Sequence, residues 1–295
     1  MDTLREIFEL SRNSVYMSLL IGLACPLVGS YLVMRRLIFM GVALPQISSC
    51  GIAFAFALHA WGIVPHFEGS EHSLAFAGSS VFTLGAILIF SAIERRGRGF
   101  VEGSIGMMYV LAGAWSILLL VKNPYGEHGL LDRLKGEIIA VSDADLYWTL
   151  GAFTLVLLTF LIFQKEFMLV SFDREMAITL KKRVLWWDSL LFFLIGLTIS
   201  MAVLSVGPLV TFGFLLVPPL TAHLFARNMR QFALIACAIG VVAASLGFYL
   251  AYRFDYPVGP TDVALLGIVY LAAAIGRQLW ILARGKSLEA VRTQS

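Results

Sequence analysis

The residues of this sequence that could do chemistry are few, and they lie in or beside long apolar runs. The ionisable candidates of this kind are His59, His223 and Glu102. Ionisable groups placed within a membrane usually serve a function. His223 is the leading candidate, although it lies four residues before Arg227, so an interfacial or packing role competes with a functional one.

No motif for nucleotide or covalent chemistry is present. The sequence lacks G-x-x-x-x-G-K-[ST], with which P-loop proteins hold ATP phosphates. It also lacks H-E-x-x-H and G-x-S-x-G, so a metalloprotease or a serine hydrolase is not supported. The residues therefore indicate a passage or a scaffold rather than an enzyme, and we expect no nucleic-acid partner.

The composition places these residues in a membrane protein. Of the 295 residues, 59% are hydrophobic and 14% are charged, and the mean hydropathy is +0.85. A soluble domain has roughly 25% charged residues, so this chain lacks the charge to cover a soluble globule. A soluble enzyme, a disordered segment and a disulfide-stapled secreted domain are excluded, and the apolar excess must face lipid.

Long apolar segments predict an all-α domain, residues 1–295, with eight or nine transmembrane helices. A helix that crosses about 30 Å of hydrocarbon needs roughly 20 mostly apolar residues. The segments of sufficient length are 13–34, 37–67, 72–93, 103–121, 146–164, 189–226, 231–252 and 263–282. Segment 189–226 is too long for one span, and Val206-Gly207-Pro208 is a turn signal near its middle. Splitting it gives nine spans, whereas a broken or re-entrant helix gives eight.

The positions of Lys and Arg predict the orientation of these spans. Most of the basic residues lie near positions 35–36, 94–98, 165–188 and 227–230, which are therefore expected in the cytoplasm. The N-terminus then lies outside and the C-terminus inside a multi-pass protein of the inner (plasma) membrane. The outer loops are acidic, with Asp255 and Asp262 among them, and carry His66, His72 and His128. Such a face could receive a cation or a basic partner, or could simply be solvated.

The most unusual cytoplasmic connection is the segment at about 165–188. A short helical pattern opens at the charged run 173–175, continues to Leu180, and is followed by the basic run 181–183. Acidic residues in the first turn and basic residues after the last suit the helix dipole. A short helix across the inner ends of the spans is a docking surface, and an ordinary amphipathic connector is the alternative.

This segment resembles the coupling loop of ABC importer permeases, whose consensus is roughly S-F-D-x-E-x-A-x-x-x-G. The matching residues are Ser171, Phe172, Asp173, Arg174, Glu175, Met176 and Ala177, with Leu180 before Lys181 at the usual glycine. Further matches follow in order: 35–41 resembles R-R-x-x-x-x-G, 136–142 resembles G-[DE]-I-L-A-V-S, and 206–210 and 217–222 resemble V-G-x-L-L-V and I-P-A-A-T-A. The sequence is thus similar, from about residue 22 to 274, to membrane subunits of the zinc, manganese and chelated-iron branch of ABC importers.

The resemblance implies a division of labour between chains. Such permeases work in pairs, as two copies or two paralogues, in the lipid membrane. Two ABC ATPase chains lie below them and an extracytoplasmic metal-binding protein lies above. ATP would then bind to the partner subunits and no cofactor to this chain. The cargo would be a transition metal ion, zinc or manganese first, with iron or a chelate as the alternative.

One feature that the resemblance implies is missing from this sequence. Family members usually carry Asp directly after the glycine of R-R-x-x-x-x-G and His four residues later, which places both on one helix face. Carboxylate and imidazole together suit zinc or manganese. Here the two positions are Val42 and Gln46, with Pro45 between them. Neither side chain can supply an anionic ligand.

The translocation path is expected beside Val42, Gln46 and Ser49, and beside the adjacent pair Pro218 and Pro219. Each proline removes a backbone donor and loosens its helix locally. Irregular backbone at membrane depth is tolerated where it faces protein or water. We therefore expect the segment around residues 218–219 to bend during gating.

Three explanations for the missing ligands are open. The metal could pass along other ligands, for which His223, His59, Glu102 and the run 48–50 are candidates. The chain could be the non-ligating half of a heterodimer, or the cargo could be a chelate. Two other classes of function are a secondary transporter driven by an ion gradient and a non-transporting membrane scaffold or degenerate subunit.

Overall fold

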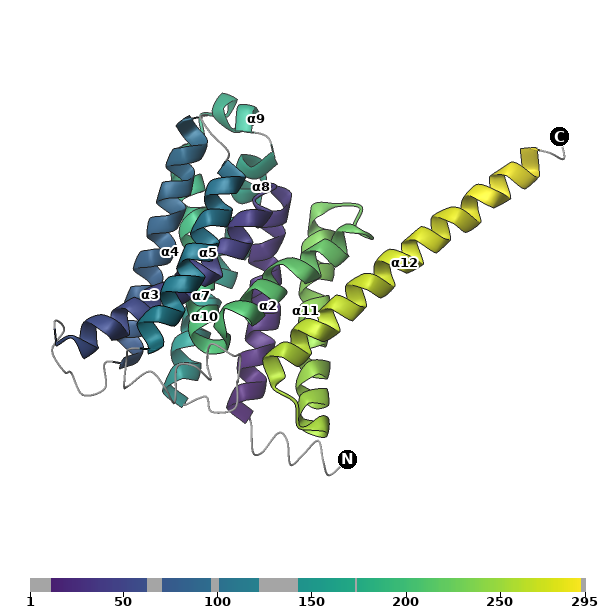
Figure 1. The fold of residues 1–295 in the computed structure, drawn as a ribbon. Coiled ribbons are helices and arrows are strands. Elements are labelled where there is room, and N and C mark those ends of the chain that lie inside the picture. The colour runs from purple at the N-terminus through teal and green to yellow at the C-terminus, as the bar shows by residue number, and fades with distance from the viewer. Residues whose placement is uncertain (1–11, 63–70, 97–100, 122–142, 173, 293–295) are drawn as a thin grey trace.

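The computed structural model describes residues 12–62, 71–96, 101–121, 143–172 and 174–292, and the regular structure within these ranges is helical. The helices are α2 (Arg12–Met34), α3 (Ile38–Ala60), α4 (Glu71–Arg96), α5 (Val101–Val121), α7 (Asp143–Ile162), α8 (Gln164–Phe172), α9 (Arg174–Thr179), α10 (Val184–His223), α11 (Met229–Phe254) and α12 (Val258–Arg292). Figure 1 shows a bundle of long helices, with the short helices α8 and α9 near one end, here called the α9 end. The predicted all-α class is confirmed.

The number of membrane crossings agrees with the eight or nine predicted. Within the described ranges, seven helices are long and apolar enough to cross a membrane, and α7 with α8, bent by 72°, makes an eighth if it is one broken span. Helix α10 has 40 residues. At a rise of 1.5 Å per residue it is about 60 Å long, twice the thickness of the hydrocarbon layer. Counting its two arms separately gives nine.

Helix α10 is broken where the sequence predicted a turn. Gly207 has φ 77° and ψ 171°, a conformation that residues with a side chain rarely adopt. Pro208 follows it and cannot donate a helical hydrogen bond. The Thr211 hydroxyl donates to the Gly207 carbonyl at 2.7 Å. The chain therefore changes direction between the arms 184–206 and 208–223 (Figure 1).

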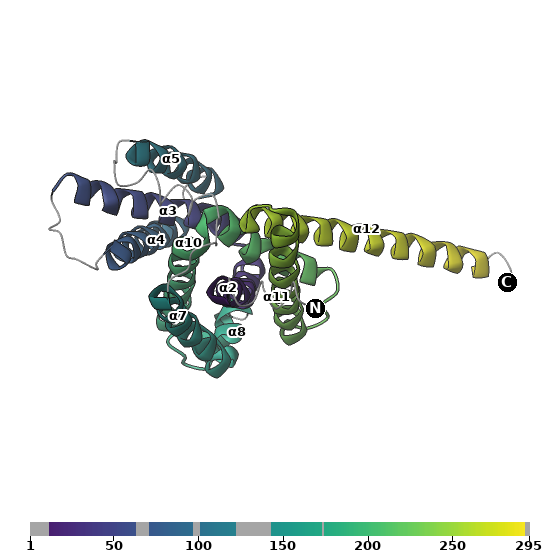
Figure 2. The same cartoon turned by 90° about the horizontal axis from the view of Figure 1, so that it is seen from below.

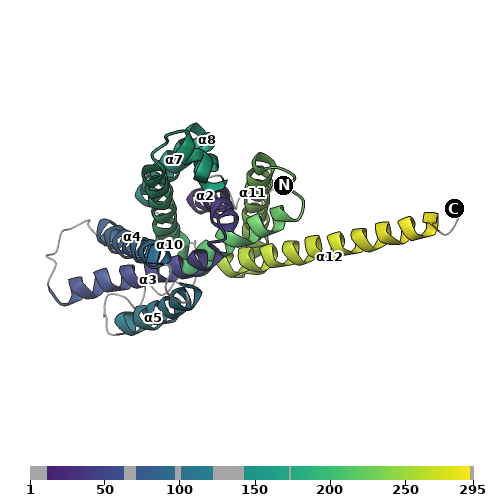
Figure 3. The same cartoon turned by 90° about the horizontal axis from the view of Figure 1, so that it is seen from above.

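Helix α10 forms the centre of the bundle, because it contacts α2, α3, α4, α7, α8, α11 and α12. Helices α5 and α12 are peripheral, with only 17% and 22% of their apolar windows buried. Figure 2 shows α5 on the outer side of α3, and Figure 3 shows α12 leading away from the other helices. Exposed apolar side chains such as Trp115 and Leu271 lie on these two helices, so lipid or another chain must cover them.

A proline and a glycine allow α2 and α10 to approach closely. Pro219 has no N–H, so the Leu215 carbonyl four residues earlier loses its helical partner. That carbonyl oxygen lies against Gly29 of α2, where a β-carbon would stand only 1.7 Å from it. Position 29 therefore has no room for a side chain, and the second arm of α10 is held against α2.

Candidate translocation path and coupling surface

The short helix α9 is anchored to the bundle by apolar contacts with its two neighbours in the chain. Ala177 is fully buried and packs with Val170 of α8 and Val184 of α10. Across the same turn, Lys182 Nζ lies 3.8 Å from Glu166 Oε1. Because its anchor is divided between α8 and α10, a displacement of α9 must move both.

The other described side chains of α9, and that of Leu180 directly after it, are exposed. Met176, Ile178 and Leu180 are 52%, 60% and 54% exposed. The basic run 181–183 is exposed beside them. Asp173 lies outside the described residues, as do the side chains of Phe172 and Arg174. Exposed apolar side chains next to charges, on a helix at the end of a bundle (Figure 1), form a surface suited to a protein partner.

Helix α9 ends on Lys181, which has a left-handed backbone with φ 55°. Its N–H donates to the Ile178 carbonyl at 2.9 Å, and the Lys182 N–H donates to the Ala177 carbonyl at 3.0 Å. This pair of bonds is the Schellman ending of a helix, in which the left-handed position favours glycine. The geometry thus explains the glycine of the resembling loops, and Lys181 forms the same turn with a side chain.

The predicted path residues of α3 carry no charge. Val42 and Gln46 lie one helical turn apart, and the Gln46 amide lies beside Gly113 of α5, where a β-carbon would stand 3.1 Å from Nε2. Ser49 is buried, and its Oγ has no hydrogen-bond partner among the described residues. Ser48 Oγ lies 2.5 Å from Ser79 Oγ of α4. This stretch of α3 thus offers an amide toward α5 and a hydroxyl toward α4.

The two predicted stretches of the path lie close to each other. Pro218 and Pro219 are buried in the second arm of α10. One turn earlier, the side chains of Leu215 and Leu216 lie 3.3 Å from the place of a β-carbon on Gly41, the neighbour of Val42. The proline segment therefore packs between α2 and the first turns of α3, and a change in its bend would displace α3.

The structure does not bring the three candidate metal ligands together. In the described part of the chain, no three His, Cys, Asp or Glu side chains are grouped closely enough to hold a metal ion. His59 is half-buried near the end of α3, and Glu102 is exposed at the start of α5. His223 is exposed at the end of α10, with its ring edge-on to Phe232 at 6.1 Å between centroids. A shared site of these three residues is not formed within one chain.

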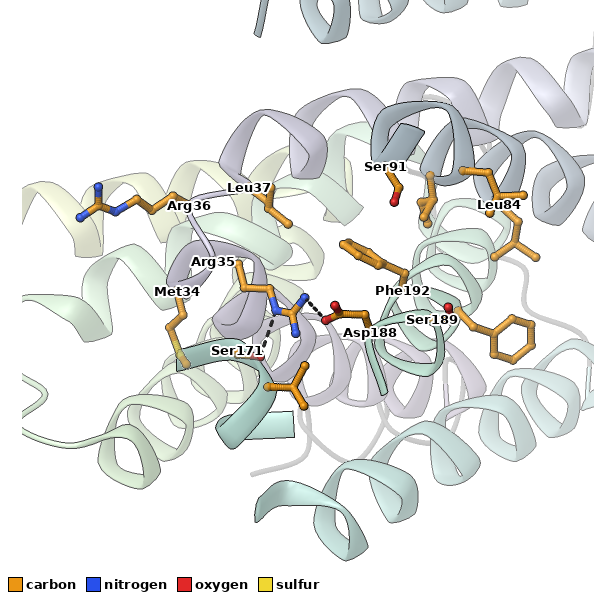
Figure 4. Close-up of a pocket in the computed structure, with 14 residues that line it drawn as sticks. Met34, Arg35, Arg36, Leu37, Leu84, Ser91, Ser171, Asp188, Ser189 and Phe192 are labelled. Atoms are coloured by element: carbon orange, nitrogen blue, oxygen red, sulfur yellow. Dashed lines mark hydrogen bonds and ion pairs between the residues drawn. The ribbon is translucent and has the colours of Figure 1, made fainter. Parts of the chain in front are cut away.

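A buried polar network at the α9 end was not predicted. Arg35 follows α2 directly, its Nη1 lies 2.8 Å from Asp188 Oδ1, and its Nε donates to Ser171 Oγ at 3.0 Å. The guanidinium carbon stands 5.7 Å from the ring centroid of Phe192. Figure 4 shows this group in the wall of a cavity of about 900 Å³ between the α2–α3 corner, α4, α8 and α10.

Asp262 does not lie in an outer loop, as the sequence suggested. It is fully buried in the second turn of α12, between Gly247 of α11 and Ser18 of α2. Helix α12 begins at Val258, before the apolar segment that starts at 263, because a proline within the first helical turn is tolerated. Asp255 is exposed directly after α11, and the histidines expected at 66 and 128 lie outside the described residues.

A bundle of membrane helices, with an exposed apolar helix at one end and uncharged polar side chains on an inner helix, is the architecture of a membrane transport subunit. Residues 7–277 match the ABC-3 family, the ABC 3 transport family. The match covers more than nine-tenths of the sequence, and the chain belongs to this family. The predicted family is thereby confirmed.

Relatives and a solved structure agree with the assignment. The chain is 29% identical over 266 residues to the manganese import system permease protein ScaB of Streptococcus gordonii, covering 90% of this chain and 91% of ScaB. It is 26% identical over 277 residues to a probable iron transport system membrane protein of Haemophilus influenzae, covering 92% and 93%. The structure superposes on PsaBC from Streptococcus pneumoniae, solved in complex with Fab, with a TM-score of 0.75 and 26% identity over 89% of this chain and 90% of that one. These similarities confirm the permease fold.

Proposed function

We propose that this chain is the membrane subunit of an ATP-driven importer that carries a transition metal ion, or its chelate, into the cell. Membership of the ABC 3 transport family supports the transport role, and the manganese and iron relatives support the cargo. In this proposal two permease subunits pair in the membrane, two ABC ATPase subunits bind and hydrolyse ATP, and an extracytoplasmic protein delivers the metal.

The orientation that we propose places the α9 end in the cytoplasm. Most of the described basic residues lie at that end. Met34 packs in one apolar cluster with Met229 and Phe232, and Met168 lines one groove with Asn228. These contacts bring the basic connections after α2, around α9 and after α10 to one end of the bundle. Cytoplasmic loops are enriched in Lys and Arg. The N-terminus is then outside and the C-terminus inside.

The observation that carries the proposal is the surface of α9. Its apolar side chains project from the end of the bundle while Ala177 holds the helix to α8 and α10. An ATPase docked on Met176, Ile178 and Leu180 would move these two helices. Helix α10 also contains the Gly207 break and, in its second arm, the proline pair next to α3, so its two arms link the docking surface to the path.

The chemistry of the path supports a cargo that needs little anionic ligation from this chain. Gln46, Ser48 and Ser49 offer neutral oxygen atoms, which bind a bare zinc or manganese ion less well than carboxylate and imidazole do. A chelated metal, or a second permease that supplies the ligands, would meet this requirement. His223, His59 and Glu102 are the residues to substitute if two copies of this chain transport a bare ion alone.

The coupling assignment is tested by the double variant Asp173→Lys with Glu175→Lys. We expect it to insert normally, to lose co-purification of the ATPase and to abolish transport, because it reverses the charge of the docking helix. The control is Asp255→Lys, an exposed acid at the opposite end of the bundle, which should retain both properties. Undiminished ATPase binding by the double variant would refute the assignment.

A further inference from the structure

We propose that Arg35 is a positioning residue that transmits the movement of α9 to α3, and thus links ATP hydrolysis to the translocation path. The inference rests on the proposed function, since it assumes that α9 docks an ATPase. It assigns a role to a residue outside both the docking surface and the path. The structure supports it in four steps.

First, one side chain connects three elements. Arg35 stands at the end of α2, Ser171 lies in the last turn of α8, and Asp188 lies in the second turn of α10. The guanidinium makes a hydrogen bond of 3.0 Å to Ser171 and an ion pair of 2.8 Å to Asp188 (Figure 4). Both charged side chains are only 12% exposed, so water screens their attraction weakly.

Second, the two partners of Arg35 belong to the elements that anchor α9. Val170, the neighbour of Ser171, and Val184, one turn before Asp188, form the apolar anchor with Ala177. A push on α9 therefore displaces Ser171 and Asp188 together. Since the ion pair is buried, breaking it would leave an uncompensated charge, so the guanidinium must follow its partners.

Third, Arg35 is fixed to α3 through a tight corner. The Arg36 N–H donates to the Val33 carbonyl at 3.1 Å, and the Leu37 N–H donates to the Leu32 carbonyl at 2.9 Å. These bonds form a Schellman ending, with Arg36 at φ 60°. Helix α3 begins immediately after, at Ile38. A displacement of Arg35 thus moves the start of α3, which leads to Val42 and Gln46.

Fourth, the network has room to change its arrangement. The cavity of about 900 Å³ adjoins the ion pair, and the hydroxyls of Ser91 and Ser189 line the same space. Arg35 Nη2 is buried and has no hydrogen-bond partner among the described residues. The Nη2 group can therefore donate a hydrogen bond to a new acceptor when α8 and α10 shift relative to α4.

The experiment measures the amount of metal transported per ATP hydrolysed in vesicles that hold the complete importer. Zinc, manganese and iron are each supplied with the delivery protein. The variants are Asp188→Asn, which removes the charge with little change in volume, and Arg35→Lys, which keeps the charge but loses the planar fork that reaches two partners. We expect the ATPase to co-purify with both variants and the metal-to-ATP ratio to fall by about fivefold or more.

The matched control is Arg36→Gln, which removes the adjacent charge from an exposed side chain and should keep the wild-type ratio. Exchanging the charges, with Arg35→Asp and Asp188→Arg together, should restore part of the ratio lost in Asp188→Asn, which a purely local loss of packing would not allow. If Asp188→Asn does not insert, Ser171→Ala tests the role of Arg35 in its place, because it leaves the ion pair intact. We expect it to lower the metal-to-ATP ratio, although to a smaller extent, and an unchanged ratio would overturn the role of Arg35.

The outcomes separate this inference from the proposed function. If the wild-type importer moves metal with ATP and the variants keep its ratio, the role of Arg35 is overturned and the proposed function stands. If the wild-type importer moves none of the three metals and hydrolyses no ATP in response to them, the proposed function fails, and the role of Arg35 with it. A lowered ratio with bound ATPase supports both.

Discussion

Two carboxylates, Asp188 and Asp262, are buried in the described part of the chain, and their surroundings differ. Asp188 faces the guanidinium of Arg35 at 2.8 Å. Asp262 lies against the backbone of Gly247, with the Ser18 hydroxyl nearby and no hydrogen bond to either carboxylate oxygen. A buried charge is costly unless it is paired. Removing the charge should therefore have opposite effects at the two positions.

At the residue scale we predict that Asp262→Asn raises the thermal unfolding midpoint of the detergent-purified protein, whereas Asp188→Asn lowers it. The first change replaces a fully buried carboxyl group, which has no basic partner among the described residues, by an amide that cannot ionise. The second leaves Arg35 buried and unpaired, a loss of about 3–5 kcal/mol in soluble proteins. Both substitutions conserve shape, so each serves as the control for the other. If both substitutions lowered the unfolding midpoint equally, Asp262 would have to be a charged group with a basic partner in the bundle.

The sequence predicted that Val42 and Gln46 share a helix face, but it did not predict the Arg35–Asp188 pair. The four-residue spacing of Val42 and Gln46 places them on one face in any helix, and α3 is helical there. The Arg35–Asp188 pair depends on how α2 and α10 meet, which spacing along the chain does not encode. The predicted spans are stretches without acidic residues, so a carboxylate always falls outside them. Asp262 therefore fell in a predicted loop, although it lies inside α12.

Helix endings govern how the elements join at both ends of the bundle. Arg36, Lys181 and Asp255 each adopt a left-handed backbone, with φ between 55° and 60°, directly after a helix. After each of them the next N–H bonds back to a carbonyl five residues earlier. This closes the helix and fixes the direction in which the chain leaves. A side chain in this conformation costs roughly 1–2 kcal/mol, which glycine avoids.

At the element scale we predict that Lys181→Gly keeps or increases stability by about 1 kcal/mol, because the turn after α9 already has the backbone that glycine favours. The control is Gln278→Gly, an exposed position within α12, where glycine adds freedom to the unfolded chain and should destabilise. Thermal unfolding in detergent compares the two variants. A loss of stability from Lys181→Gly as large as that from Gln278→Gly would contradict the prediction.

The elements that could be predicted are those whose breaks have a chemical signal. Gly207 and Pro208 predicted the division of α10, and the charged run 173–175 predicted the short helix α9. The bend of 72° between α7 and α8 falls at Phe163, where no glycine or proline stands, so the expected single span 146–164 missed it. Contacts of Phe163 and Phe167 with Trp187 of α10 are present at this bend, and such tertiary packing has no local pattern.

At the scale of the whole molecule, the two ends of the bundle differ in charge, and this predicts a labelling pattern. The native cysteines Cys25, Cys50 and Cys237 lie within helices and can be replaced before a reporter cysteine is introduced. With a membrane-impermeant thiol reagent on intact cells, we expect Asp255→Cys to react. Leu180→Cys should react only after permeabilisation, because the proposed orientation places the α9 end in the cytoplasm. The opposite pattern would reverse the proposed orientation.

The consequence of having Val42 and Gln46 where Asp and His are usual depends on the assembled importer. One chain offers Gln46 and Ser49 along α3, and its described residues form no group of metal ligands. The largely exposed apolar faces of α5 and α12 leave space for a second permease or lipid. The metal could then meet other ligands of this chain, or its site could be completed by a second copy, by a paralogue, or by the chelating groups of the cargo itself.

These possibilities make different predictions for vesicles that contain this permease, its ATPase and its delivery protein, with zinc, manganese and iron in competition and no second permease. Because this chain supplies neutral oxygen atoms where carboxylate and imidazole are usual, we expect little ATP-dependent uptake of a bare ion, although the ATPase remains bound. Adding a paralogous permease with Asp and His at these positions, or supplying the metal as a chelate, should then restore uptake. Strong uptake of one bare ion by two copies of this chain would contradict the expectation and show that other ligands exist. Substitution of His223, His59 and Glu102 would then identify which of them the ion meets.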